Sequence, residues 1–187
     1  TYVNTFDNYG TWSTGGAASD FGTNATNTLN NYGTITAFNI LNGVNSTTPT
    51  SSVVYNAGVV NNRGTIDMQN GVVGDVLTFA NDGTGSFVGG ANSRLLVDAS
   101  LEAGHQLSDQ LMVDNVSGIT TVNVNVTNVP NLSAKTFGDG ILVVGVGGTS
   151  TSGAFVLKNP ITAGLYVYDY HLVQGITDTQ SWFLRSD

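Results

Sequence analysis

A five-residue pattern, Asn31-Tyr32-Gly33-Thr34-Ile35, decides the fold because it recurs along the chain. Two close copies are Asn8-Tyr9-Gly10-Thr11-Trp12 and Asn62-Arg63-Gly64-Thr65-Ile66, so the shared pattern is Asn-x-Gly-Thr-apolar. Asn and Gly both tolerate a positive φ angle, and each copy therefore predicts a tight turn that leads into a strand. The copies lie roughly 20–30 residues apart, which is the length of one coil of a solenoid.

A parallel β-helix accounts for this repeat, because a single coil cannot bury its apolar face and must stack on its neighbours. Asn residues at equivalent turns can then form a ladder of side chains along the stack. Residues 1–73 contain thirteen Asn but only one Lys or Arg, Arg63, which suits stacking because like charges one coil apart would repel. A β-sandwich with Asn-Gly hairpins would use the same turn residues and is the alternative fold.

The composition of the 187 residues indicates an all-β protein. Only 10% of the residues are charged, and Gly, Asn, Thr and Val, which favour turns and strands, take their place. A single Glu and two Lys leave little material for exposed helices. Disorder is the competing interpretation, but a hydrophobic content of 40% in short alternating runs favours a folded core.

Charge and cysteine content argue against several classes of function. The net charge is −8 and no basic patch is present, so nucleic acid is a poor partner. The absence of Cys excludes a disulfide framework, a Cys-based zinc site and thiol catalysis. No apolar run approaches the length of a membrane-spanning helix, and we expect no membrane insertion of this segment.

The sequence pattern changes at Gly74, where the strand signals lengthen and Asn becomes less frequent. The run Val122–Val126 alternates strictly between Val and Asn, which places the three Val on one face of a strand. Ile141–Val144 is a continuous apolar run, as in a strand buried on both faces. We therefore predict two segments, with Asn-x-Gly-Thr coils in residues 1–73 and a second block of coils in residues 74–187.

Aromatic residues concentrate near the C-terminus, where a solenoid needs a cap over its last core layer and its open strand edges. Tyr166–Tyr170 is predicted to be a strand with three Tyr on one face, and Trp182–Arg185 is the final strand signal. Packing beneath the cap is favoured over sugar or partner binding for the Tyr stripe. The residues predicted to form the cap are Tyr166, Tyr168, Trp182, Phe183 and Leu184.

An exposed loop is predicted between Asn42 and Ser52, inserted in one of the coils. Its polar residues and its proline are typical of a loop that does not continue a strand. The residues of this loop that are candidates for contact with a partner are Asn45, Ser46, Thr47, Thr48 and Pro49.

A series of short elements then follows in an order known from one protein family. They are Gly74-Asp75-Val76-Leu77-Thr78, Gly83-Thr84-Gly85-Ser86-Phe87, Leu95-Leu96-Val97-Asp98, Ser108-Asp109-Gln110-Leu111-Met112-Val113, Gly118-Ile119-Thr120-Thr121-Val122, Gly138-Asp139-Gly140-Ile141-Leu142-Val143-Val144, Phe155-Val156-Leu157, Ala163-Gly164-Leu165-Tyr166-Val167-Tyr168 and Ser181-Trp182-Phe183-Leu184-Arg185. In this order they resemble the C-terminal passenger region of pertactin-like autotransporters. Asn115 and Gln110 depart from that pattern, in which Gly and Arg are frequent.

The resemblance implies a right-handed parallel β-helix with a C-terminal β cap. It also implies that the C-terminal section is an autochaperone, which emerges and folds first outside the cell and then promotes folding and export of the preceding coils. The expected location is the bacterial cell surface, with anchoring in the outer membrane, or release into the medium. The expected partner is the protein's own outer-membrane β-barrel, following residue 187 in the whole protein. A monomer without cofactor or metal is expected.

Three functions remain open at this point. The first is a non-enzymatic stalk and folding cap, and the second is an adhesin or virulence factor whose loops bind a host cell-surface or matrix molecule. The third is a polysaccharide-active enzyme, which needs clustered carboxylates in a groove. Asp residues are instead scattered at turn-like positions, and no Gly-rich calcium repeat is present. His105, Ser108 and Asp109 are too weak a pattern for a hydrolytic triad, because no Gly-x-Ser-x-Gly elbow accompanies them.

Overall fold

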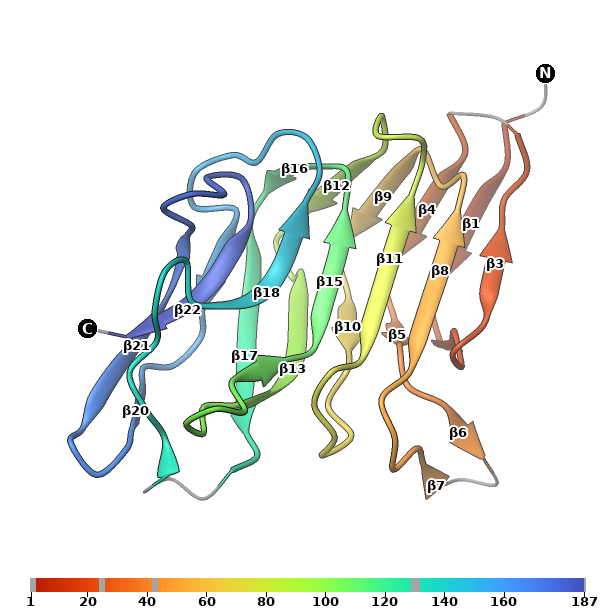
Figure 1. Cartoon of the computed structure of the whole chain (residues 1–187). Coiled ribbons are helices and arrows are strands. Elements are labelled where there is room, and N and C mark those ends of the chain that lie inside the picture. Colours follow the sequence, from red (N-terminus) through yellow and green to blue (C-terminus); the bar gives the residue numbers. More distant parts are fainter. Residues whose placement is uncertain (1–2, 24–25, 42–43, 129–131, 187) are drawn as a thin grey trace.

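The computed structural model describes residues 3–23, 26–41, 44–128 and 132–186. Most of its strands form three mainly parallel sheets, and successive coils stack along one axis into a β-helix (Figure 1). The predicted all-β fold and parallel β-helix are thereby confirmed. In the described part of the chain no residue lies in an α-helix, and no helix there is long and apolar enough to cross a membrane.

Each of the first five coils contributes one strand to every sheet. The first sheet contains β1 (Thr5–Asn8), β4 (Thr28–Asn31), β9 (Val59–Asn62), β12 (Ser86–Gly89) and β16 (Asn115–Gly118). The second contains β2 (Thr11–Ser13), β5 (Thr34–Thr36), β10 (Thr65–Asp67), β13 (Arg94–Ser100), β17 (Thr120–Val126) and β19 (Phe155–Leu157), with β14 (Leu107–Ser108) antiparallel to β13. The third contains β3 (Ala18–Asp20), β8 (Ser51–Tyr55), β11 (Val76–Ala80), β15 (Gln110–Val113) and β18 (Ile141–Val146), followed by β22 (Trp182–Ser186), β21 (Tyr168–Gln174) and β20 (Ile161–Ala163).

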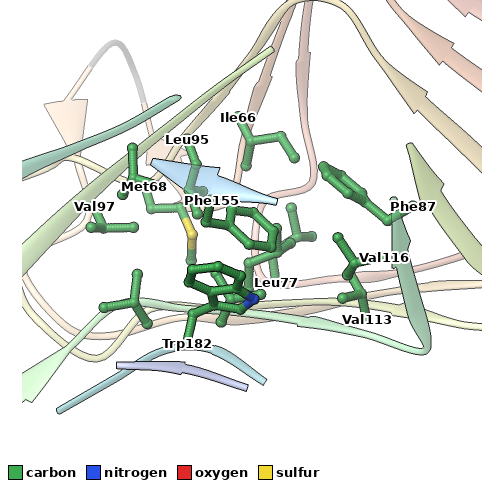
Figure 2. Packing of buried hydrophobic residues seen from close by; sticks show 14 of the residues in the cluster. Ile66, Met68, Leu77, Phe87, Leu95, Val97, Val113, Val116, Phe155 and Trp182 are labelled. Carbon is green, nitrogen blue, oxygen red and sulfur yellow. The ribbon is translucent and has the colours of Figure 1, made fainter. Parts of the chain in front are cut away.

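The core consists of apolar side chains that occupy the same register position in successive coils. In the second sheet one such row is Trp12, Ile35, Ile66, Leu95, Val122 and Leu157. A matching row in the first sheet is Phe6, Leu29, Val60, Phe87 and Val116. Figure 2 shows members of these rows packed together inside the helix. Each fully buried side chain of this size contributes about 1.5–3 kcal/mol, so the rows supply most of the force that holds the coils together.

A buried polar ladder runs along the corner between the first and second sheets. Asn8 Nδ2 donates to Asn31 Oδ1 at 2.8 Å, and Asn31 Nδ2 donates to Asn62 Oδ1 at 2.7 Å. The ladder continues through Ser93, which accepts from Asn62 at 2.7 Å and lies 2.8 Å from the hydroxyl of Thr120. The Asn of each repeated motif therefore satisfies the Asn of the next coil, as a buried polar group requires.

The predicted loop between Asn42 and Ser52 begins with a short antiparallel hairpin of β6 (Ile40–Leu41) and β7 (Val44–Asn45), and it ends where β8 starts at Ser51. Residues 42–43 lie outside the described residues.

Strands on the two sides of residue 73 pair with each other, since β8 pairs with β11 and β10 pairs with β13. The boundary between segments 1–73 and 74–187 stays a prediction.

Candidate functional site

The C-terminal end of the β-helix is covered by an antiparallel sheet extension. After β18 the third sheet continues through β22, β21 and β20, each antiparallel to its neighbour (Figure 1). Trp182 is paired with Val144, and Leu184 with Ile141. The outermost strand, β20, has three residues, and a short edge strand offers little template for pairing with another chain.

Trp182 places its indole ring inside the last coil. Its exposed fraction is 4%, and its ring lies edge-on against Phe155 with 5.7 Å between centroids. Phe155 stacks in turn on Phe87 at 6.3 Å, so an aromatic column extends from the cap into the interior (Figure 2). The indole Nε1 donates to Ser150 Oγ at 2.9 Å, which satisfies the polar end of the buried ring.

The other two cap residues of β22 are also buried, but on opposite faces of the strand. Leu184 belongs to the central core cluster and is fully buried. Phe183 is 8% exposed and lies under the loop at Gly175, where a side chain at position 175 would meet the Phe183 ring. A terminal strand that is buried on both faces excludes water from the end of the core.

The predicted Tyr stripe is only partly realised. Tyr170 is 1% exposed and donates its hydroxyl to the carbonyl of Ala134 at 2.6 Å, and Tyr168 packs partly buried against the core. Tyr166 is 79% exposed in the turn between β20 and β21. The predicted strand over Tyr166–Tyr170 is wrong in its first two residues, because Val167 adopts a positive φ of 57° and the strand begins at Tyr168.

Two further contacts hold the cap in place. Thr136 and Ser186 exchange hydrogen bonds of 2.9 Å between the main-chain N–H of each and the hydroxyl of the other. The carboxylate of Asp139 accepts the N–H groups of Ile176, Thr177 and Asp178 at 2.5, 2.7 and 3.2 Å. These bonds, the one from Thr177 most strongly, lower the pKa of Asp139 below its usual value.

Three fully buried carboxylates, Asp75, Asp98 and Asp109, gather between the second and third sheets, and we call them the carboxylate corner. Asp109 accepts the N–H groups of Gly74 and Asp75 on one oxygen, at 2.9 and 3.0 Å, and that of Asp98 on the other, at 2.7 Å. Asp98 accepts the N–H groups of Asn70 and Gly71. The carboxylates of Asp98 and Asp109 thus hold the main chain of residues 70–75, which belongs to the preceding coil.

Burial raises the pKa of two residues of the corner, Asp109 and Asp75. Desolvation raises the pKa of Asp109 to about 8, against the lowering effect of its main-chain hydrogen bonds and with a further raising effect from the charges of Asp75 and Asp98. Desolvation also raises the pKa of Asp75. Within the described residues no group of three or more His, Cys, Asp or Glu side chains is placed to hold a metal ion. The corner orders turns by hydrogen bonding.

Comparison with known proteins bears directly on this region. Residues 57–172 match the family described as Autochaperone Domain Type 1. The chain belongs to this family. The matched residues include the whole carboxylate corner and the buried Tyr170.

Two proteins of Escherichia coli (strain K12) are similar to this chain. "Probable autotransporter YfaL" is 36% identical over 146 residues, which cover 75% of this chain and 11% of that protein. "Uncharacterized protein YuaQ" is 32% identical over 131 residues, which cover 69% of this chain and 9% of that protein. The chain therefore spans about a tenth of the length of these curated relatives.

The predicted contact loop, Asn45 to Pro49, lies on the surface and outside the residues matched to the family. Its side chains are exposed except for that of Ser46, which is half-buried because its hydroxyl accepts the N–H of Thr48 at 3.1 Å and donates to the carbonyl of Thr48 at 2.6 Å. The exposed members are Asn45, Thr47, Thr48 and Pro49. The loop is thus accessible, and its contact role stays a prediction.

Ser108 and Asp109 lie buried in the autochaperone domain, whereas His105 is exposed in the preceding turn. The hydroxyl of Ser108 donates to the carbonyls of Asp109 and Leu142, at 2.9 and 2.5 Å. A hydroxyl with these contacts is a structural hydrogen-bond donor and has no access to a substrate.

Sequence reasoning missed the carboxylate corner and the Asp139 contacts. The motifs that contain Asp75, Asp98, Asp109 and Asp139 were visible, but the main-chain N–H groups that these carboxylates accept lie in other turns of the chain. The recurrence of Asp before or after apolar strands was the one signal that could have indicated the corner.

Proposed function

We propose that this segment is the part of an autotransporter passenger that folds early outside the cell and then serves as the template for the coils that precede it. Family membership supports the general role of a passenger autochaperone. The observation that carries the finer proposal is the cap, in which Trp182, Phe183 and Leu184 are buried by antiparallel strands. A coil array that is sealed at one end can grow only from the other.

At the opposite, N-terminal end of the β-helix, aromatic side chains are left partly exposed. Phe6, Trp12 and Phe21 form an edge-to-face aromatic cluster in the first coil, with ring centroids 5.3–6.5 Å apart. Phe6 is 40% exposed there. Another coil stacked on this end would bury the cluster, and burial of apolar surface is the favourable step in adding a coil. The two ends therefore support a direction of folding, from the cap toward the N-terminus.

We infer that the whole protein is displayed on the bacterial cell surface or released from it, with its own outer-membrane β-barrel as the partner of this segment. Membership of the autochaperone family supports a surface-exposed or secreted, outer-membrane-associated protein. The role is non-enzymatic in this proposal, because the clustered carboxylates are fully buried and hold main-chain N–H groups.

The experiment compares Trp182→Ala with Trp12→Ala in a full-length protein that contains this segment. We expect Trp182→Ala to lower the amount of folded, protease-resistant passenger on the cell surface, since the template for the other coils is lost. Trp12→Ala, the same substitution in the first coil of this segment, should lower it much less. Equal losses for the two variants would contradict a folding direction that starts at the cap.

Adhesion is a second candidate function, and the exposed hairpin and loop over residues 44–49 favour it. This insertion lies outside the stacked sheets, so its residues can contact a host cell-surface or matrix molecule without disturbing the core. Replacement of residues 44–49 by a Gly/Ser linker should abolish cell binding and leave surface display unchanged. Unchanged cell binding would remove this candidate.

A further inference from the structure

A small pocket lies on the outer face of the second sheet, away from the cap and the contact loop. It has a volume of about 200 Å³ and is formed by the turn before β13, by β13 and β17, and by the residue that follows β19. The side chains that bear on its chemistry are Asn92, Arg94, Leu96, Thr121, Asn123 and Lys158.

The charge of this pocket is opposite to that of the protein. The chain has 5 Lys and Arg residues against 13 Asp and Glu residues, yet Arg94 and Lys158 line the same pocket. Both residues are exposed, and neither side chain makes a hydrogen bond or an ion pair with another described residue. Two unpaired cations in an acidic protein favour an anionic ligand, because its binding supplies the missing counter-charge.

The remaining lining residues suit a ligand with hydroxyl groups. The amides of Asn92 and Asn123 and the hydroxyl of Thr121 provide donors and acceptors that are not used by other described side chains. Leu96 is half-buried and provides an apolar surface for C–H groups. A planar guanidinium beside such groups is matched to a carboxylate or a phosphate, to which it donates two parallel hydrogen bonds.

We propose that this pocket binds an anionic sugar, that is, a single sugar unit with a carboxylate or a phosphate group. A pocket of this volume holds about one ring, and the net charge of −8 on the whole chain disfavours a polymer with closely repeated negative charges. The acidic residue nearest in register is Asp67, which is paired with Leu96 on the neighbouring strand. One oxygen of Asp67 already accepts the N–H of Gln69 at 3.0 Å.

The test titrates the 187-residue chain with four probes and follows binding by calorimetry and NMR. The probes are glucuronic acid, glucose 6-phosphate, methyl glucoside and inorganic phosphate. We expect one or both anionic sugars to bind at least about tenfold more tightly than methyl glucoside and inorganic phosphate, since each control lacks one half of the recognised chemistry. The comparison of the two anionic sugars identifies the preferred anionic group.

Variants assign binding to the pocket. Arg94→Gln and Lys158→Gln should each weaken binding by about tenfold or more, whereas Arg63→Gln should leave it unchanged. Arg63 is a control for the loss of one positive charge because it does not line the pocket: its guanidinium lies over the Tyr32 ring of the preceding coil. Lys158 is exposed, so its variant keeps the test valid if Arg94→Gln is unstable. The proposal is overturned if neither anionic sugar binds, or if inorganic phosphate binds as tightly as the better of the two anionic sugars. It is also overturned if both pocket variants bind that sugar as tightly as the wild type does.

Discussion

The indole Nε1 of Trp182 donates a hydrogen bond of 2.9 Å to the hydroxyl of Ser150, and this bond joins β22 of the third sheet to the end of the first sheet. Ser150 lies beside Val116 of β16 in an isolated parallel bridge. The same indole contacts Phe155 of the second sheet, so one side chain links the ends of all three sheets. The cap therefore holds the three sheets together at the C-terminal end of the β-helix.

We expect Trp182→Ala to lower the free energy of unfolding by about 3–5 kcal/mol, through loss of buried surface and creation of a cavity. Because the cap is proposed to form early, refolding should slow more than unfolding accelerates. Stopped-flow folding and unfolding rates in urea measure both effects.

Two further variants make this prediction specific. Trp182→Phe retains most of the ring but removes the donor to Ser150 and should cost about 1–2 kcal/mol, including the unsatisfied partner. Trp12→Ala, at the open end, should accelerate unfolding and leave the refolding rate near that of the wild type. A refolding rate unaffected by Trp182→Ala would contradict an early role for the cap.

A second prediction concerns the buried ladder and uses two adjacent Asn residues of β4. Asn31 accepts from Asn8 and donates to Asn62 and to the carbonyl of Thr65, all in the interior. Asn30 also bonds to both neighbouring coils, on the outer face and with the opposite direction: it donates to Asp7 and accepts from Asn61. Removal of one member of a buried pair leaves its partners unsatisfied, whereas water replaces a partner at the surface.

We therefore expect Asn31→Ala to lower the free energy of unfolding by about 2–4 kcal/mol and Asn30→Ala by less than about 1 kcal/mol. Equilibrium urea denaturation followed by circular dichroism measures both values. Similar losses for the two variants would mean that the interior ladder carries no special stability.

The part of the fold that sequence reasoning reached is the part in which neighbours in sequence determine the structure. The predicted turn at Asn31-Tyr32-Gly33 is present between β4 and β5, but the positive φ from which it was predicted is wrong, since neither Asn31 nor Gly33 adopts one. The strict alternation in Val122–Val126 specifies which side chains face inward. The predicted burial of Trp182 followed from a general requirement, since an uncapped solenoid exposes its last core layer.

The part that sequence reasoning missed depends on contacts between coils. Asp75 meets Asp109 through the stacking of β11 on β15, and Asp98 meets Asp109 through the antiparallel pairing of β13 with β14. Tyr166 was misplaced for a local reason, because alternation alone does not show that Val167 turns the chain with a positive φ. The carboxylate corner could not be derived without knowing which strands pair with each other.

A third prediction tests the close approach of successive turns in the repeated motif. A side chain on Gly33 would lie 2.1 Å from the carbonyl oxygen of Gly10, whereas one on Gly10 would meet nothing within 4 Å. We expect Gly33→Ala to lower the midpoint of thermal unfolding strongly, at a cost of about 2–4 kcal/mol, because main-chain atoms of two coils must move apart. Gly10→Ala should change stability by less than about 1 kcal/mol, and a similar loss for both would refute the close-packing argument.

The last prediction concerns pH and the carboxylate corner. Burial raises the pKa of Asp109 to about 8, above its value of about 3.9 in an unfolded chain, so the folded state binds this proton more tightly. Its contribution to stability is therefore full below about pH 4 and is lost as the pH rises through about 8. The raised pKa of Asp75 acts in the same direction. The lowered pKa values of Asp139 and Asp178 act oppositely, with stability lost only as the pH falls below their usual range.

We thus expect the free energy of unfolding to fall by about 1–3 kcal/mol between pH 6 and pH 9, since each unit of pKa shift corresponds to about 1.4 kcal/mol. Urea denaturation across this range measures the slope. Asp109→Asn should flatten it, whatever the variant's absolute stability, because the titrating group is gone. Asp82→Asn is the matched control: it removes an exposed charge at a position with a φ of 50°, which Asn tolerates, and should retain the wild-type slope. A slope that Asp82→Asn flattens as much as Asp109→Asn would point to the general charge of the chain and away from the corner.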